Sequence, residues 1–181
     1  MNTRLVGSEM CIRDRSIVTS PYNQFENPLY SNNKIIGTYV NSIMALHDAI
    51  ERGSDEALLL DSNENISEGS GENLFIVKNE ELITPTPDNC LNGITRQSII
   101  KIAQDENIDV IEKKLKYDDL VDADEAFFTG TAVEVTPISK VDETTIGDSM
   151  IGPITKKLQK IFTDTVTNKN KKYAHWLDPI N

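Results

Sequence analysis

The sequence predicts an α+β fold, a single domain in which flanking helices pack on one curved, mixed sheet. The length of 181 residues fits one domain with a sizeable core. Short apolar runs bounded by glycine, proline and asparagine recur along the chain, as in strands, and the segments between them carry apolar residues at helical spacing. Strands in runs with helices interspersed favour an α+β or mixed α/β architecture.

Residues 1–15 show neither a strand nor a helix period, and they lack the apolar core and cleavage site of a secretory signal. The string LVGSEMCIRDR at positions 5–15 resembles translated sequencing-adaptor read-through. We therefore expect residues 1–15 to be a non-native segment and residues 16–181 to be the native domain, with the upstream coding sequence lost.

The native domain is predicted to begin with one strand and one helix. Residues 16–20 have the composition of a strand and lead into a loop rich in asparagine and proline. Residues 36–52 carry apolar side chains at helical spacing, and Gly53 ends this helix. The stripe expected to face the core consists of Tyr39, Ile43, Leu46 and Ile50.

A meander of short strands is expected next. Residues 56–61 form a buried-type strand, and residues 66–68 form a second strand that ends at Gly69-Ser70-Gly71. Residues 73–77 and 82–84 then pair as a hairpin.

The second half of the chain alternates between helices and strands. Periodicity predicts a helix over 95–106 and a short helix over 117–121. Strands are expected at 110–115, 125–129 and 132–141. Pro153 opens a last amphipathic helix. Its inner stripe is expected to be Ile154, Leu158, Ile161, Phe162 and Val166.

Composition excludes several classes of partner. The chain has 29 Asp and Glu against 18 Lys and Arg, and its net charge of −11 opposes binding to nucleic-acid phosphates and anionic membranes. No apolar run approaches the ~18 residues of a membrane span. The 2 cysteines form neither a disulfide framework nor a zinc site. We expect a cytoplasmic protein without a metal site, whose partners are small molecules or copies of itself.

Two segments in the first half can carry chemistry. Lys34 precedes an apolar helix start, and a lysine among apolar neighbours loses part of its proton affinity and can attack carbonyls. The alternative is a surface lysine whose stem covers apolar neighbours. Glycines at 69 and 71 leave Glu68 and Glu72 near a chain reversal that can aim one carboxylate at a ring nitrogen or a cation. The alternative is a β-bulge with solvated acids.

Two glycine-containing segments in the second half suit anions. Gly93 precedes a helix N-terminus at Ile94 and Thr95, where free N–H groups and the helix dipole favour a phosphate. The alternative is that Thr95 is an ordinary helix cap. A strand breaks at Gly130 and is followed by the hydroxyl and amide of Thr131, as in an anion-binding nest or in a plain loop.

These segments, in this order, resemble the branched-chain-amino-acid aminotransferases, which are fold-type IV (class IV) pyridoxal-phosphate enzymes. The resemblance rests on KIIGTYVNS at 34–42, ISEGSGENLF at 66–75, NGITR at 92–96 and GTAVEVTP at 130–137. It runs from about residue 16 to the end of the chain and covers the family's larger C-terminal domain. It implies that domain's curved sheet, or pseudo-barrel, with flanking helices.

The resemblance implies a role for each matching residue around the ring of the cofactor, pyridoxal 5'-phosphate. Lys34 matches the lysine that holds the cofactor covalently and moves a proton at the substrate α-carbon. Tyr39 matches the tyrosine that hydrogen-bonds the phenolic oxygen. Glu68 matches the carboxylate that keeps the pyridine nitrogen protonated, and Leu91 falls where an apolar side chain packs on the ring.

The resemblance also implies two sites for anionic groups. Ile94 and Thr95 match the helix end that receives the cofactor phosphate, and Thr131 adds its hydroxyl and amide. The amides of Thr131 and Ala132 match the site for the substrate's α-carboxylate, which every amino acid carries whatever its side chain.

The implied reaction is amino-group transfer between leucine, isoleucine or valine and 2-oxoglutarate, so the partners are amino acids and 2-oxo acids. The segments 39–42 and 130–134 favour this reaction over two alternatives of the same fold, a D-amino-acid aminotransferase and an aminodeoxychorismate lyase. Family members are homodimers or larger homo-oligomers. The smaller N-terminal domain, which supplies a phosphate-binding arginine, is not in this sequence. We therefore expect impaired activity, and an inactive cofactor-binding fragment is the third alternative.

Overall fold

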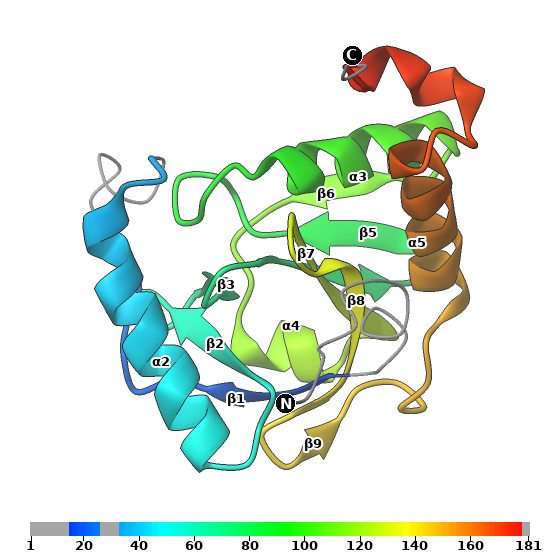
Figure 1. Ribbon diagram of the computed structural model, residues 1–181. Coiled ribbons are helices and arrows are strands. Elements are labelled where there is room, and N and C mark those ends of the chain that lie inside the picture. The colour runs from blue at the N-terminus through cyan, green and yellow to red at the C-terminus, as the bar shows by residue number, and fades with distance from the viewer. Residues whose placement is uncertain (1–14, 26–32, 179–181) are drawn as a thin grey trace, which may run out of the picture.

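The computed structural model describes residues 15–25 and 33–178 and places them around one strongly curved sheet (Figure 1). The strands are β1 (Arg15–Thr19), β2 (Glu56–Leu60), β3 (Ile66–Gly69), β4 (Asn73–Lys78), β5 (Glu81–Thr84), β6 (Val110–Glu112), β7 (Glu125–Gly130), β8 (Glu134–Val141) and β9 (Thr144–Thr145). The α-helices are α2 (Tyr39–Glu51), α3 (Ile94–Asp105), α4 (Tyr117–Val121) and α5 (Pro153–Val166), and the 3-10 helices are η2 (Ile36–Thr38) and η3 (Lys171–Trp176).

The sheet is mixed and curls back towards itself. Its strand order is β3-β2-β1-β8-β7-β4-β5-β6, and β9 pairs with β8. β1 runs parallel to β2 and β8, β5 runs parallel to β6, and the other pairs are antiparallel. β3 and β6 lie at opposite ends of this order, yet the amide of Ile66 in β3 donates to the carbonyl of Leu115, just beyond β6, over 2.8 Å. This bridge links the two ends of the strand order. The sheet therefore forms a curled half-barrel, with α4 in its centre (Figure 1).

Apolar side chains pack on both faces of the curled sheet. The inner cluster joins the sheet to α4 through residues such as Leu74, Phe128 and Leu120. The outer cluster fixes α3 and α5 to the sheet, with Phe75 and Phe127 stacked at 5.1 Å between ring centroids. A third, smaller cluster lies between α2 and strands β1 and β2. The predicted α+β class, with one curved sheet and flanking helices, is confirmed.

Most predicted elements form within a residue or two of their expected ends. The helix at 117–121, the hairpin of β4 and β5 and the start of α5 at Pro153 are confirmed. The strand expected over 110–115 ends at Glu112. The extended segment expected from 132 becomes a strand only at Glu134, whose φ of 53° belongs to a turn. β1 begins at Arg15, and residues 1–14 of the expected non-native segment lie outside the described part of the chain.

The predicted inner face of α2 is wrong. Ile43 and Ile50 are 64% and 59% exposed, whereas Ala45 and Ala49 are fully buried against β1 and β2. Small side chains let the helix approach the sheet closely, which turns the larger apolar residues outward. In α5, Leu158 and Phe162 are buried as expected, but Val166 is 43% exposed and threonines at 155 and 165 complete the inner face.

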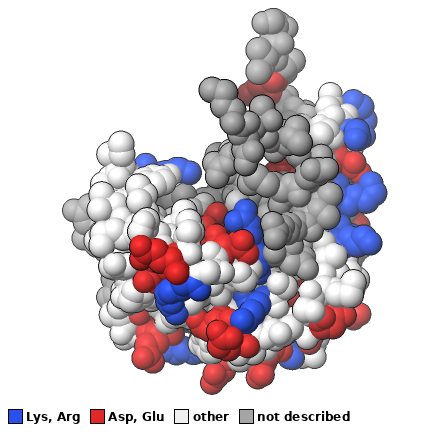
Figure 2. All heavy atoms as spheres, turned by 60° about the horizontal axis from the view of Figure 1, so that its bottom comes forward, with Lys and Arg blue, Asp and Glu red and all other residues white. Residues whose placement is uncertain are grey.

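On the face shown in Figure 2, acidic and basic side chains are interspersed, with several basic groups along the right-hand edge. Within the described ranges, no helix has both the length and the apolar character needed to cross a membrane.

Candidate active site

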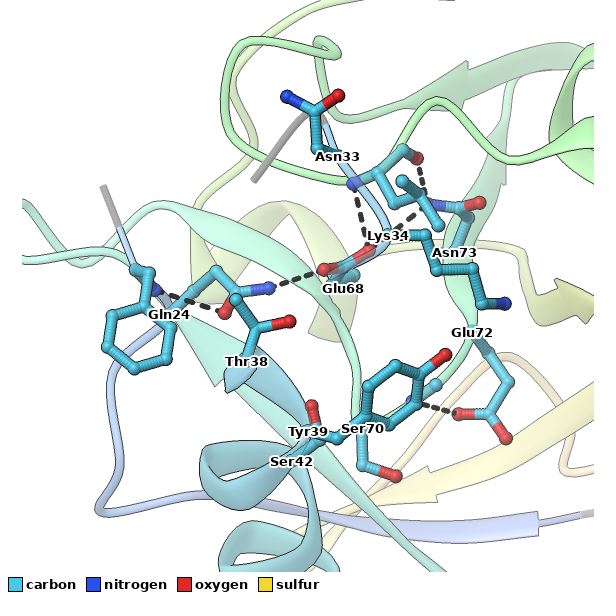
Figure 3. A pocket seen from close by; sticks show the side chains of 13 residues that line it. Gln24, Asn33, Lys34, Thr38, Tyr39, Ser42, Glu68, Ser70, Glu72 and Asn73 are labelled. Atoms are coloured by element: carbon cyan, nitrogen blue, oxygen red, sulfur yellow. Dashed lines mark hydrogen bonds between the residues drawn. The ribbon is translucent and has the colours of Figure 1, made fainter. Parts of the chain in front are cut away.

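A small hollow lies where four segments meet at one end of the curled sheet. It encloses about 60 Å³ and is lined by the loop after β1, the start of α2, the turn between β3 and β4, and the loop before α3. It brings together five of the residues that the sequence singled out: Lys34, Tyr39, Glu68, Glu72 and Leu91. Figure 3 shows the Lys34 side chain, the Tyr39 ring and the Glu72 carboxylate facing the same space.

The turn between β3 and β4 positions the acidic residues of the hollow. The amide of Gly69 donates to the carbonyl of Glu72 over 2.7 Å and closes the turn. A Cβ at position 69 would lie 2.9 Å from Glu72 Oε2 and 3.0 Å from the Phe128 ring, so only glycine fits without displacement. The turn thereby carries Glu68, at the end of β3, and Asn73, at the start of β4, to the same edge of the sheet.

Three donors hold the Glu68 carboxylate. The Gln24 amide donates to Oε1, while the Leu91 amide and Asn73 Nδ2 donate to Oε2 over 3.1 and 3.3 Å. Burial nevertheless dominates and raises the pKa of Glu68 to about 7, although the bonds from Leu91 and Gln24 and the nearby Lys34 charge act in the opposite direction. Glu68 is partly exposed, and its carboxylate faces the hollow, as the functional interpretation of this turn predicts.

Glu72, a second carboxylate that lines the hollow, also has a raised pKa, and the buried Glu56 lies beside it. Glu56 is 4% exposed and accepts hydrogen bonds from the amides of Ala57 and Ser70 over 2.7 and 3.2 Å. Burial, followed by repulsion from Glu56, raises the pKa of Glu72 to about 8. The two neighbouring carboxylates thus disfavour each other's charged forms.

Lys34 does not have the apolar surroundings that its sequence neighbours suggest. Its side chain is exposed, and Ile35 and Ile36 are 37% and 89% exposed. Of the two interpretations of Lys34, the exposed side chain agrees with the surface lysine, because the segment crosses the open side of the hollow. Tyr39, the first residue of α2, is 38% exposed and lines the same opening.

Ile94 and Thr95 lie at the N-terminus of α3, as predicted, but outside the hollow of Lys34. Gly93 is the extended N-cap residue, and no side chain caps the helix, so Thr95 is not an ordinary cap. Both residues line a separate groove of about 490 Å³ that also involves Phe162 and Trp176. Ile94 is 83% exposed and Thr95 is 7% exposed.

Thr131 and Ala132 are exposed in the turn between β7 and β8 and line neither cavity. The preceding Gly130 lies next to the hollow, since a Cβ there would be 3.5 Å from the carbonyl of Gly71 and 3.6 Å from Glu72 Cγ. The structure thus places this turn at the rim of the site rather than inside it.

Sequence reasoning missed Gln24 and Asn73, which hold the Glu68 carboxylate. Asn73 lies in the motif ISEGSGENLF at 66–75. Its separation from Glu68 along the chain does not indicate a contact unless the conformation of the turn between them is known. Gln24 lies in a loop without any pattern, and only the pairing of β1 with β2 brings it next to β3. No sequence signal was available for it.

Comparisons with known proteins agree with this geometry. A family model described as amino-transferase class IV matches residues 12–141. The branched-chain-amino-acid aminotransferase of Pseudomonas aeruginosa is 43% identical over 172 residues, which cover 94% of this chain and 56% of that protein. A probable branched-chain-amino-acid aminotransferase of Aquifex aeolicus is 44% identical over 168 residues, covering 92% of this chain and 54% of that protein.

Solved structures share the fold as well. The T.th. branched-chain amino acid aminotransferase, complexed with N-(5'-phosphopyridoxyl)-L-glutamate, gives a TM-score of 0.90 at 40% identity and covers 93% of this chain and 57% of that one. The Escherichia coli enzyme gives a TM-score of 0.89 at 38% identity, covering 93% and 58%. The chain spans just over half the length of the curated relatives that it matches. Because the family model matches well over half of its residues and its curled sheet is that of these enzymes, the chain belongs to the class IV aminotransferase family.

Proposed function

We propose that this chain supplies the cofactor-binding part of a branched-chain-amino-acid aminotransferase that uses pyridoxal 5'-phosphate. Curated relatives at 38–44% identity carry that enzyme name, and related structures contain derivatives of this cofactor. These names favour amino-group transfer from leucine, isoleucine or valine to 2-oxoglutarate over a D-amino-acid aminotransferase or an aminodeoxychorismate lyase.

The observation that carries the proposal is that the Glu68 carboxylate and the Lys34 amine line the same hollow. Glu68 lies on its inner side and Lys34 on its open side. Ionising Glu68 there is costly, as its raised pKa of about 7 indicates. A protonated ring nitrogen in the hollow would add a positive partner to that of Lys34 and favour the carboxylate form. Lys34 lines the same hollow and offers an amine for covalent attachment. The donor set therefore fits pyridoxal phosphate.

Each side chain of the hollow has a distinct proposed task. When bound, the cofactor supplies a carbonyl that takes up amino groups and a ring that accepts electrons. Lys34 would hold the cofactor through that carbonyl, with loss of water, and would move the proton at the substrate α-carbon once the substrate amine has replaced it. Tyr39 donates a hydrogen bond to the phenolic oxygen, Glu68 holds the proton on the ring nitrogen, and Leu91 packs on the ring face.

The anionic groups are assigned to backbone donors outside the hollow. We propose the N-terminus of α3, at Ile94 and Thr95, together with Thr131, for the cofactor phosphate. The amides of Thr131 and Ala132 are proposed for the substrate carboxylate. The close approach of Gly130 to Glu72 supports this, because it sets the turn at the rim of the hollow.

Further protein is proposed to complete the site. The hollow of about 60 Å³ is small beside the ~300–1,000 Å³ of ordinary ligand pockets. On α2, Val40, Ile43 and Met44 are 63%, 64% and 45% exposed next to the site. We propose that the remainder of a longer protein and a second copy cover this region, in a homodimer or larger homo-oligomer. We also propose that the protein works in the cytoplasm and that residues 1–15 are non-native.

Covalent trapping tests the proposal. The 181-residue chain is incubated with pyridoxal phosphate, reduced with borohydride and mapped by peptide mass spectrometry. A pyridoxyl group is expected on Lys34 at concentrations that leave the exposed Lys101 and Lys160 unlabelled, and Lys34→Ala should remove it. Preferential labelling of another lysine would contradict the assignment.

Turnover tests the substrate class. The chain alone is expected to bind the cofactor weakly and to transfer little or no amino group. Fusing the N-terminal domain of a family member ahead of Ser16 should restore leucine-dependent formation of glutamate. Activity with D-alanine but not with leucine in that fusion would favour the D-amino-acid alternative, and release of pyruvate from aminodeoxychorismate would favour the lyase.

A further inference from the structure

Asn73 joins two parts of the site that the sequence separates. It is the first residue of β4 and is 5% exposed. Its Nδ2 donates to the carbonyl of Leu91 over 2.7 Å and to Glu68 Oε2 over 3.3 Å. The Leu91 amide itself donates to Glu68 Oε2 over 3.1 Å. One amide group therefore closes a ring of hydrogen bonds between the end of β3 and the loop before α3, and Figure 3 shows Asn73 approaching Glu68 from the side opposite Gln24.

The other end of the Asn73 side chain is confined as well. A Cβ at Gly93, the N-cap residue of α3, would lie 2.4 Å from Asn73 Oδ1. The Asn73 backbone is held by its pairing with Thr129 of β7. The Asn73 side chain thus packs between β4 and Gly93, at which α3 begins. The position of this side chain and the position of the start of α3 therefore depend on each other.

We infer that Asn73 is a positioning residue that fixes the Glu68 carboxylate at a set distance from the start of α3. This inference deepens the proposed function and rests on it. In the proposed function, the ring nitrogen of the cofactor is held at Glu68 and its phosphate at Ile94 and Thr95. Because the ring is rigid, the distance between Glu68 and the N-terminus of α3 must stay constant. The Asn73 NH2 group has the two N–H donors needed for the Leu91 carbonyl and the Glu68 carboxylate, whereas a hydroxyl has only one.

The electrostatic consequence is specific to Glu68. Among the described residues, Lys34 across the hollow lowers the pKa of this carboxylate, and the neighbouring Cys90 thiol stays neutral because burial raises its own pKa to about 12. The donors are Gln24, Leu91 and Asn73. A donor to the carboxylate stabilises its charged form, so losing the Asn73 amide should raise the pKa of Glu68 further.

The test follows the titration of Glu68 by carboxyl-carbon NMR in the cofactor-free chain. Asn73→Ala is expected to raise the midpoint by about one pH unit. Asn73→Asp keeps the shape but replaces the donor by an acid, so a larger rise is expected. Asn89→Ala is the matched control. Asn89 is also buried and its Nδ2 also donates over 3.3 Å to a carboxylate, but that carboxylate is Asp61. The Glu68 midpoint should not move in this control.

The wild-type chain gives an independent measurement if the variants do not fold. The side-chain amide resonances of Asn73 should titrate with the same midpoint as Glu68, because the bond strengthens when the carboxylate ionises. Variants that fold but leave the Glu68 midpoint unchanged, or Asn73 resonances that do not follow it, would overturn the inference. None of these readouts involves the cofactor, so failure of the labelling at Lys34 would count against the proposed function alone.

Discussion

Replacing Glu68 with glutamine should make the free energy of unfolding less dependent on pH. Glutamine keeps the shape of the side chain, and its oxygen can still accept hydrogen bonds from the Leu91 amide and Asn73 Nδ2. It removes the proton equilibrium and also one acceptor, because the new amide nitrogen faces the Gln24 amide. The lost acceptor does not titrate, so the pH dependence of the difference reports the cost of ionising Glu68.

The direction of the pKa shift determines whether Glu68 stabilises the fold at low or at high pH. Burial raises the pKa of Glu68 from 4.5 to about 7, so between these values the folded chain binds more protons than the unfolded chain. The contribution of Glu68 to stability is fully present below pH 4.5 and is lost as the pH rises through 7. The shift from 4.5 to about 7 corresponds to about 3 kcal/mol.

Urea unfolding at pH 4.5, 6, 7 and 8 measures this contribution. The stability of Glu68→Gln relative to wild type should increase by about 3 kcal/mol between pH 4.5 and 8. Glu143→Gln is the control, because the Glu143 side chain is 97% exposed and should leave the slope unchanged. Glu72→Gln should reduce the slope in the same direction, over a window that extends to about pH 8. Parallel pH curves for wild type and Glu68→Gln would refute the reasoning.

Two further substitutions test the packing around the site. Gly93→Ala places a Cβ 2.4 Å from Asn73 Oδ1 and should lower the free energy of unfolding by ~1–3 kcal/mol, whereas Gly71→Ala, which meets nothing within 4 Å, should cost little. Equal urea midpoints for the two variants would contradict this account. On α2, Ile43→Ser should reduce light scattering by aggregates and change stability by less than ~0.5 kcal/mol, because this side chain is 64% exposed. Ala45→Ser places a hydroxyl in the fully buried contact between α2 and the sheet, so a loss of stability is expected. A larger loss for Ile43→Ser than for Ala45→Ser would show that the inner face of α2 is misassigned.

Local patterns were sufficient for most elements and for the family. The helix at 117–121, the hairpin of β4 and β5 and the proline that opens α5 each depend on periodicity and turn residues within a few positions, so they could be predicted from the sequence. The motifs around Lys34 and Glu68 identified the family for the same reason. Each is a short run in which residue order carries the information.

Non-local packing decided what these patterns could not. The inner face of α2 depends on how closely the helix approaches β1 and β2, so Ala45 and Ala49 replace the larger apolar residues that periodicity favoured. The near-closure of the sheet depends on the contact between Ile66 and Leu115, which no local pattern encodes.

The candidate site divides in the same way. The sequence by itself determined that Lys34 and Glu68 are candidates, because their types and neighbours suit the chemistry. Tertiary structure decided that they share one hollow, that Lys34 is exposed there, and that Gln24 and Asn73 hold the Glu68 carboxylate. These outcomes depend on segments that meet only after the sheet has curled, since desolvation and hydrogen bonding act between neighbours in space.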